Sequence, residues 1–239
     1  MSARKRKPRL YTFAESLPFG VLLAAIGGFL DAYTYITRGG VFANAQTGNI
    51  VLLGIRFAQG DFWGMLQYVY PILAFTAGVV AAAQIKRMAG AGRKVQWVHI
   101  ILALEAAILF GIGFLPSTVP HAIVNVVISF VASVQVSSFQ SLMGSPFATT
   151  MTTGNLRSAV QAYYQAVTRK NKPALQKALC YTWIIVSFCG GAMIGVWTSY
   201  FFGTYSLFLC VAILTASLIW SVVDKKVCGE SAEDEEKSE

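Results

Sequence analysis

Two copies of a short polar motif are the residues of this sequence best suited to bind a small molecule. Thr47-Gly48-Asn49 and Thr153-Gly154-Asn155 each lie in an apolar segment, and the two copies are 106 residues apart. Glycine permits the backbone angles of a chain reversal, whereas threonine and asparagine can cap a helix start and satisfy freed backbone amides. The positive end of a helix dipole at each motif would favour polar or anionic solutes over cations. The motifs therefore predict a binding site for a polar solute.

Three charged side chains lie in or beside apolar segments, where an ionisable group is costly and is a candidate for function. Asp31 could bind a cation or a proton, or accept hydrogen bonds that hold the first motif in place. Glu105 could be a neutral carboxyl group bonded to another helix, or a carboxylate that couples transport to protons. Arg157 could extend to the cytoplasmic surface, attract an anion, or pair with one of the two acids.

The expected solute-binding residues combine the two motifs with polar residues around them. They are Asp31, Asn44, Gln46, Thr47, Gly48, Asn49, Gln140, Thr152, Thr153, Gly154, Asn155 and Arg157, with Glu105 as the coupling candidate. Gln140 belongs to a polar face that suits either a hydrated pathway or hydrogen bonds between helices. No Ser–His–Asp set, GxSxG, HExxH or P-loop motif occurs, and the titratable residues are few and scattered. We therefore expect no catalytic residue, no metal and no cofactor, and a protein that is not an enzyme.

The composition points to a membrane protein. Of the 239 residues, 55% are hydrophobic and only 13% are charged, and the mean hydropathy is +0.56. Soluble domains carry about 25% charged residues, so a soluble enzyme or a disordered chain is close to excluded. The net charge of +8 comes from basic residues that flank apolar runs, a pattern typical of membrane topology signals and not of nucleic-acid binding.

Six apolar runs are long enough to cross a bilayer as helices, which takes about 20 residues. They are Leu17–Ile36, Phe62–Ile85, Val95–Leu115, Val119–Leu142, Ala178–Phe202 and Tyr205–Val223. The two motif segments, Phe42–Ala58 and Phe147–Val167, could cross as well, or could enter the membrane and return. Two re-entrant segments leave all but Arg38 and Arg56 of the 19 basic residues on one face. The positive-inside rule therefore favours six spans with two re-entrant half-helices over eight spans in a parallel repeat.

A second pair of matching segments supports an internal duplication. Phe75-Thr-Ala-Gly78 and Phe188-Cys-Gly-Gly191 follow the two motifs in the same order, 113 residues apart. Three crossings and one re-entrant segment per half form an inverted repeat, whose half-helices would meet near the midplane. The alternative is that both motifs are turns that pack ordinary spans closely.

Four regions follow from this prediction. They are a basic cytoplasmic N-terminus at 1–16, membrane repeats at 17–115 and 119–223, and an acidic, disordered cytoplasmic tail at 224–239.

The segment Gly27-Gly28-Phe-Leu-Asp31-Ala is followed by Gly39-Gly40-Val-Phe-Ala-Asn-Ala-Gln-Thr-Gly-Asn-Ile-Val-Leu-Leu-Gly54. Together with Thr153-Gly154-Asn155-Leu, this pattern resembles the YoaK-like family of bacterial multi-pass inner-membrane proteins, a domain of unknown function and predicted transporter. The resemblance covers about residues 12–225. It implies a multi-pass protein of the bacterial plasma membrane, without an established substrate.

We therefore expect a channel or secondary transporter for a small polar solute, which could be anionic, with both termini in the cytoplasm. The expected partners are the lipid bilayer and the solute, with a homo-oligomer left open and no nucleic acid. The alternatives are a non-transporting partner subunit and a membrane protein that acts on lipid.

Overall fold

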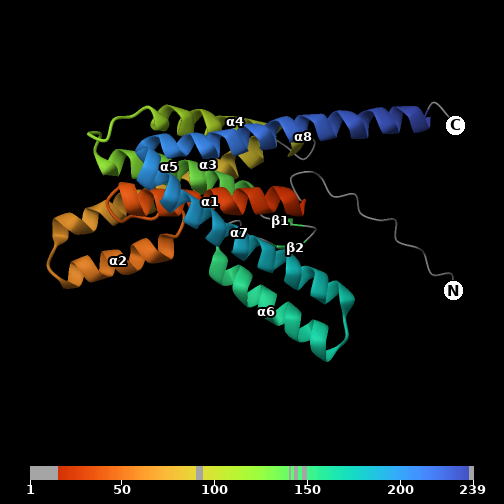
Figure 1. Cartoon of the computed structure of the whole chain (residues 1–239), viewed down its shortest axis with the longest axis horizontal. Helices are drawn as coiled ribbons and strands as arrows, with labels where there is room; N and C mark the ends of the chain where they lie inside the picture. The colour runs from red at the N-terminus through yellow and green to blue at the C-terminus, as the bar shows by residue number, and fades with distance from the viewer. Residues whose placement is uncertain (1–15, 90–93, 140, 143–144, 147–149, 237–239) are drawn as a thin grey trace.

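The computed structural model describes residues 16–89, 94–139, 141–142, 145–146 and 150–236, and Figure 1 shows a bundle of long helices. The α-helices are α1 (Leu17–Thr37), α2 (Gln46–Ala58), α3 (Phe62–Ala89), α4 (Lys94–Gly113), α5 (His121–Ser138), α6 (Thr152–Thr168), α7 (Lys172–Phe202) and α8 (Leu207–Glu236). A short 3-10 helix, η2 (Gly203–Ser206), joins α7 to α8, and the two-residue strands β1 (Ser141–Leu142) and β2 (Ser145–Pro146) pair in an antiparallel register.

Each of the six apolar runs that the sequence predicts to span the membrane is largely helical, although several helix ends differ from the predicted ends. The fourth run was expected to continue to Leu142, but α5 ends at Ser138, and Ser141 pairs with Pro146 instead. Serine side chains compete for backbone hydrogen bonds, and a nearby proline cannot continue a helix. Gln140, expected to bind solute from this run, lies outside the described residues.

Four stretches of the described chain are long and apolar enough to cross a bilayer, judged by length and composition. They are Leu17–Thr37, Phe62–Met88, His121–Ser138 and Lys172–Val223, the last of which contains both α7 and α8. A shorter apolar helix, His99–Gly113, lies within α4. These apolar helices indicate a lipid bilayer environment.

The chain path sets α2 and α6 apart from the other helices. In Figure 1, α1 runs leftward along the bundle, and α2 begins beside the middle of α1 and returns to the same left end. After α3, α4 and α5 have traversed the bundle, α6 begins near the middle and runs to the right end, where α7 starts. The two short helices therefore run from the centre toward opposite ends.

Two pairs of helices pack closely through glycine. Helix α7 packs against α1, and α3 packs against α5. A Cβ atom at Gly191 of α7 would clash with the backbone of Ala25 in α1, and one at Gly78 of α3 would clash with the carbonyl of Phe130 in α5. Gly191 follows Gly78 by 113 residues, and Phe130 follows Ala25 by 105. The matching segments of the two halves thus make matching contacts.

The main hydrophobic core includes side chains from α1, α4, α5 and α8, while many large apolar side chains are exposed on the outer surface. The last helix departs from expectation. The segment after Asp224 was predicted to be disordered, but α8 continues through it to Glu236. Its Glu, Lys and Ala residues favour helix, and extending an existing helix avoids the cost of nucleation. The basic N-terminus up to residue 15 and the last three residues lie outside the described part.

Candidate functional site

Asp31 holds the segment that leads into α2. One carboxyl oxygen, Oδ1, accepts hydrogen bonds from the backbone N–H groups of Asn44 at 2.6 Å and Ala45 at 3.3 Å. The Asp31 side chain is buried within the described residues. Of the two roles expected for Asp31, these contacts correspond to the one in which it fixes the position of the first motif.

Asn49 closes the same segment from the other side. Its Oδ1 accepts a hydrogen bond from the Phe42 N–H at 2.9 Å, and its Nδ2 donates to the Phe42 carbonyl at 2.7 Å and to Gln46 Oε1 at 2.9 Å. Asn49 is fully buried, and Gln46 Nε2 donates to the carbonyl of Ala43 at 2.9 Å. Because these bonds satisfy the loop backbone, Asn49 fixes the loop and its amide has few groups left for a solute.

The role predicted for the motif glycines is wrong. The residues with positive φ in this region are Gly39 and Gly40, at 86° and 73°, and they make the chain reversal. Gly48 is inside α2, where a Cβ atom would lie 2.8 Å from the ring of Phe42. Gly154 is likewise helical, and a Cβ there would meet no atom within 4 Å. Gly48 therefore provides space for an aromatic ring.

Side-chain capping of the two short helices is also not observed. The N-cap residues are Ala45 for α2 and Met151 for α6, and neither makes a side-chain cap hydrogen bond. The backbone N–H groups of Thr47, Thr153 and Gly154 have no hydrogen-bond partner among the described residues. The Thr47 and Thr153 side chains are exposed. Both helix starts therefore offer unpaired amide donors.

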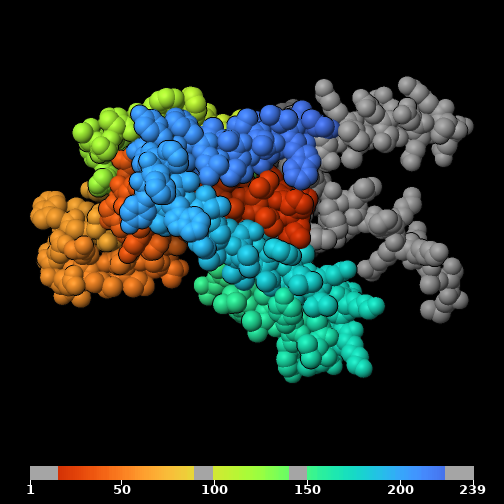
Figure 2. Space-filling model, viewed as in Figure 1, coloured from red at the N-terminus to blue at the C-terminus, as the bar shows by residue number. Residues whose placement is uncertain are grey.

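The second motif is more open than the first. Asn155 is buried like Asn49, Thr152 is half-buried, and Thr153, Gly154 and Arg157 are exposed. Arg157 forms no ion pair within the described part of the chain, so it pairs with neither Asp31 nor Glu105. Figure 2 shows a notch in the molecular surface between α2 and α6.

The two segments meet at Gly27, the central residue of the 21-residue helix α1. Asn44 Nδ2 donates to the Gly27 carbonyl at 3.2 Å. On the other segment, a Cβ atom at Gly27 would clash with the Cγ2 methyl group of Thr150. Asn44 and Thr150 are 106 residues apart, the same separation as the two motifs. Neither Gly27 nor Thr150 was predicted to belong to the site, because only tertiary packing brings them together.

Glu105 belongs to a separate contact. It is fully buried in α4, and both of its carboxyl oxygens accept from Gln135 Nε2 of α5, at 3.0 and 2.9 Å. This is the hydrogen bond to another helix that was one of its two expected roles. Within the described residues, no hydrogen bond or ion pair joins Glu105 to either motif.

Arg38 is a buried polar residue that the sequence-based list of site residues omitted. Its guanidinium donates to Tyr33 Oη at 3.1 Å and to Thr204 Oγ1 at 3.0 Å, and Asn125 Nδ2 donates to its carbonyl at 2.8 Å. The sequence signal that could have found Arg38 is that the expected topology leaves only two basic residues, Arg38 and Arg56, on the outer face. It supports the end of α1 from which the first motif segment departs.

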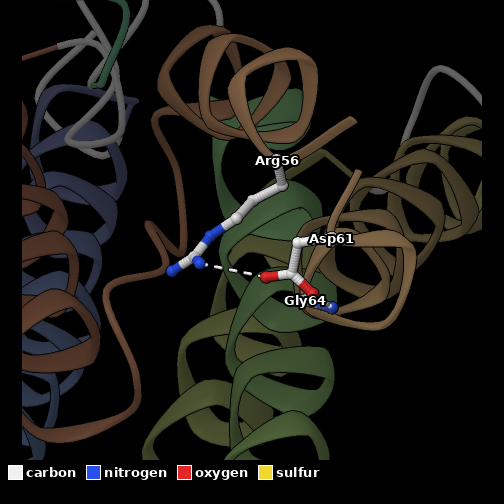
Figure 3. A network of polar contacts seen from close by, with 3 residues as sticks. All are labelled: Arg56, Asp61 and Gly64. Atoms are coloured by element: carbon white, nitrogen blue, oxygen red, sulfur yellow. Dashed lines mark hydrogen bonds and ion pairs between the residues drawn. The ribbon is translucent and has the colours of Figure 1, made fainter. Parts of the chain in front are cut away.

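Arg56, the second basic residue outside the basic clusters, is part of a surface ion pair between α2 and α3. Arg56 Nη1 lies 3.0 Å from Asp61 Oδ2, and Asp61 Oδ1 accepts from the Gly64 N–H at 2.8 Å (Figure 3). The two side chains are 43% and 40% exposed, and exposed pairs contribute only about 0–1 kcal/mol. We assign this pair to the turn and to the start of α3.

Comparisons with known proteins agree with the resemblance noted in the sequence. A family model described as "Protein of unknown function (DUF1275)" matches residues 19–220. The chain is 28% identical over 181 residues to the UPF0700 transmembrane protein YoaK of Bacillus subtilis (strain 168), covering 72% of this chain and 79% of the relative. No solved structure matches the chain.

Proposed function

The chain belongs to the DUF1275 family, and from this premise we propose that it is a membrane channel or secondary transporter for a small polar solute. The solute site is formed by the starts of α2 and α6. The protein is not an enzyme in this proposal. It lies in the bacterial plasma membrane, with both termini in the cytoplasm.

The proposed topology has six crossings and two re-entrant half-helices. Helix α2 has 13 residues and α6 has 17, which at 1.5 Å per residue gives about 20 and 25 Å, less than a hydrocarbon core of about 30 Å. Each helix begins near the bundle centre and runs back to the end of the bundle from which the chain came (Figure 1). This path supports entry and return on one side of the membrane.

The matching contacts of the two halves support an inverted repeat. Gly78 packs α3 against α5, and its counterpart Gly191 packs α7 against α1. An axis in the membrane plane that relates the halves would also relate α2 to α6, which run in opposite directions from the centre. The two half-helices would then enter from opposite sides and bring their starts together.

The unpaired backbone donors carry the proposal. Hydrocarbon cannot satisfy an N–H group, so irregular backbone at membrane depth is tolerated only when it is buried in protein or lines a cavity. The N–H groups of Thr47, Thr153 and Gly154 lie at the starts of the half-helices with no partner among the described residues. Water or a polar solute at the notch between α2 and α6 would satisfy them.

Proline substitution tests these donors directly, because proline removes one backbone N–H. Thr47 and Thr153 are the second residues of α2 and α6, and the chain already has proline at the second residue of α1 and α7. We expect Thr47→Pro and Thr153→Pro each to lower solute flux at least tenfold in proteoliposomes. Ala122→Pro, at the second residue of α5, is the matched control and should keep normal flux.

The assay is stopped-flow light scattering of vesicles after an osmotic step, with a panel of small polar solutes. Circular dichroism and thermal unfolding in detergent establish that each variant folds. Unchanged flux in both folded threonine variants would rule out the site. If the unaltered protein moves no solute, transport itself fails, and a non-transporting partner subunit becomes the better explanation.

A further inference from the structure

We infer that the cytoplasmic half of the solute path is a water-filled route along one face of α6, and that Arg157 makes this route unfavourable for cations. This inference rests on the proposed function and describes how a solute reaches the same site from the cytoplasm. The observation that carries it is the pattern of side chains on the exposed surface of α6, where a polar line and an apolar line lie next to each other.

The two lines follow the same helical spacing. The polar line is Arg157, Gln161, Gln165 and Thr168, and the apolar line is Leu156, Val160, Tyr164 and Val167. Steps of four, four and three residues keep each line on one side of the helix, and a shift of one residue, about 100°, separates the lines. All eight residues are exposed. The remaining side of α6 is buried at Asn155, Ala159 and Ala162, and α6 packs against α7.

Contacts with α7 place the middle of α6 at the depth of a membrane span. Tyr163 Oη lies 3.1 Å from Thr182 Oγ1, and Thr182 belongs to the apolar run Ala178–Phe202 that the sequence predicts to cross the membrane. Leu179, one turn before Thr182, is exposed, as expected of a side chain that faces lipid. Gln161 lies two residues nearer the bundle centre than Tyr163, so in the proposed topology it is at hydrocarbon depth.

Lipid suits the apolar line but not the polar line. Charged side chains at membrane depth face the protein interior or a water-filled cavity, because hydrocarbon does not solvate them. Arg157, Gln161 and Gln165 have no side-chain hydrogen bond or ion pair with the described residues. The described part of this chain therefore does not satisfy the polar line, which requires water or another protein.

Water is favoured over a second copy of the chain, because the membrane part of a second copy has no free carboxylate to offer Arg157. Residues 16–223 contain three acids, which are Asp31, Asp61 and Glu105. Asp31 and Glu105 are buried, and Asp61 already forms the surface ion pair with α2. A charge that is buried without a partner is strongly destabilising. A second copy packed on the polar line would leave Arg157 in that state.

The polar line also connects the cytoplasm with the proposed site. It ends at Thr168, directly before the polar turn 169–171 that leads into α7. At its other end, Arg157 lies one turn after Thr153, whose backbone N–H is unpaired within the described residues. Arg157 is the one charged side chain on this line, and residues 106–223 contain no acid. Its positive charge disfavours cations, so the route admits neutral and anionic solutes.

Cysteine labelling tests the route without a transport assay. In the full chain with its four native cysteines replaced by alanine, Gln161→Cys and Val160→Cys place thiols on the polar and the apolar line at adjacent positions. Inside-out membrane vesicles receive a membrane-impermeant methanethiosulfonate, either the anionic sulfonatoethyl or the cationic trimethylammonioethyl reagent. We expect Gln161→Cys to react about a hundredfold faster, because the reactive thiolate does not form in lipid. Ile55→Cys, at the exposed α2 position 106 residues before Gln161, should react as slowly as Val160→Cys.

The same two reagents test the role of Arg157. At Gln161→Cys, the rate of the anionic reagent divided by the rate of the cationic reagent should fall about threefold when Arg157→Gln is added, because residues four apart are neighbours on a helix. Arg56→Gln removes an exposed positive charge from the ion pair between α2 and α3. It is the matched control and should leave this ratio unchanged.

The outcomes separate this inference from the proposed function. Equal rates at Gln161→Cys and Val160→Cys overturn the water-filled route, as does a slow Gln161→Cys that forms a disulfide with a second copy. An unchanged ratio in Arg157→Gln overturns the exclusion of cations. Arg157→Cys and Leu156→Cys provide a second adjacent pair if a variant of the first pair does not fold. If the labelling agrees but no solute crosses the membrane in the flux assay, transport fails while the water-exposed face of α6 stands.

Discussion

The two segments that carry the Thr-Gly-Asn motifs differ in the contacts that hold them among the described residues. The first is fixed by Asp31, which accepts two backbone hydrogen bonds, and by Asn49, which bonds to both backbone groups of Phe42. The second exposes Thr153, Gly154 and Arg157. Both motifs bury their asparagine, and the Asp31 carboxyl group is an additional anchor of the first segment.

Removal of that anchor should have the largest effect on stability. Asp31→Leu leaves the N–H groups of Asn44 and Ala45 without their acceptor, at about 1–3 kcal/mol for each buried group. We expect a loss of about 3 kcal/mol in unfolding free energy, measured by equilibrium unfolding in mixed micelles. Val136→Ala, at a buried apolar position of α5, is the comparison and should cost less, because it removes only two methyl groups. Equal losses would contradict the difference between the halves.

The shared asparagine should behave alike in both halves. Asn49 and Asn155 are 0% and 4% exposed, so replacing either by alanine removes a buried polar side chain. We expect Asn49→Ala and Asn155→Ala each to lower the unfolding free energy by about 2 kcal/mol. Their equilibrium unfolding curves provide the measurement. A loss confined to Asn49→Ala would mean that Asn155 does not stabilise the second segment in the way that Asn49 stabilises the first.

The contact that joins the halves should give the smallest of these effects. Gly27→Ala places a methyl group against the Thr150 Cγ2 methyl. We expect a loss of about 1 kcal/mol, at the lower end for overpacking, because the clash is with a side-chain end and not with backbone. Thr150→Ser removes that methyl while keeping the hydroxyl, so the double variant should recover about 1 kcal/mol in a double-mutant cycle. Additive effects of the two substitutions would show that the second segment does not rest on Gly27.

Much of the architecture is predictable from the sequence because long apolar runs leave few alternatives in a membrane. Each expected span is helical, and the order of the motifs pointed to matching segments whose close contacts are now visible at Gly78 and Gly191. The end of α5 at Ser138 was not predictable from hydropathy, since Phe139 and Leu142 are as apolar as the helix before them.

The motifs lie at the starts of α2 and α6, but the contacts that their residues make were not predictable from the sequence. The motif positions mark both helix starts, but Asn49 bonds to the preceding loop instead of capping α2, and Gly48 makes room for Phe42. The partner of Glu105 also depends on tertiary packing, because Gln135 is one of several polar residues on α5 that spacing alone cannot distinguish. Local residue types suggest which groups can bond, whereas the fold determines which of them meet.

The position of Gly27 also limits how the protein can move. Helix α1 supports both motif segments. The Asn44 side chain is hydrogen-bonded to the Gly27 carbonyl, and Thr150 packs against the same residue. Any tilt or rotation of α1 would therefore displace Asn44 and Thr150, and the motif segments that contain them, together. The starts of α2 and α6 would then move as one unit with α1.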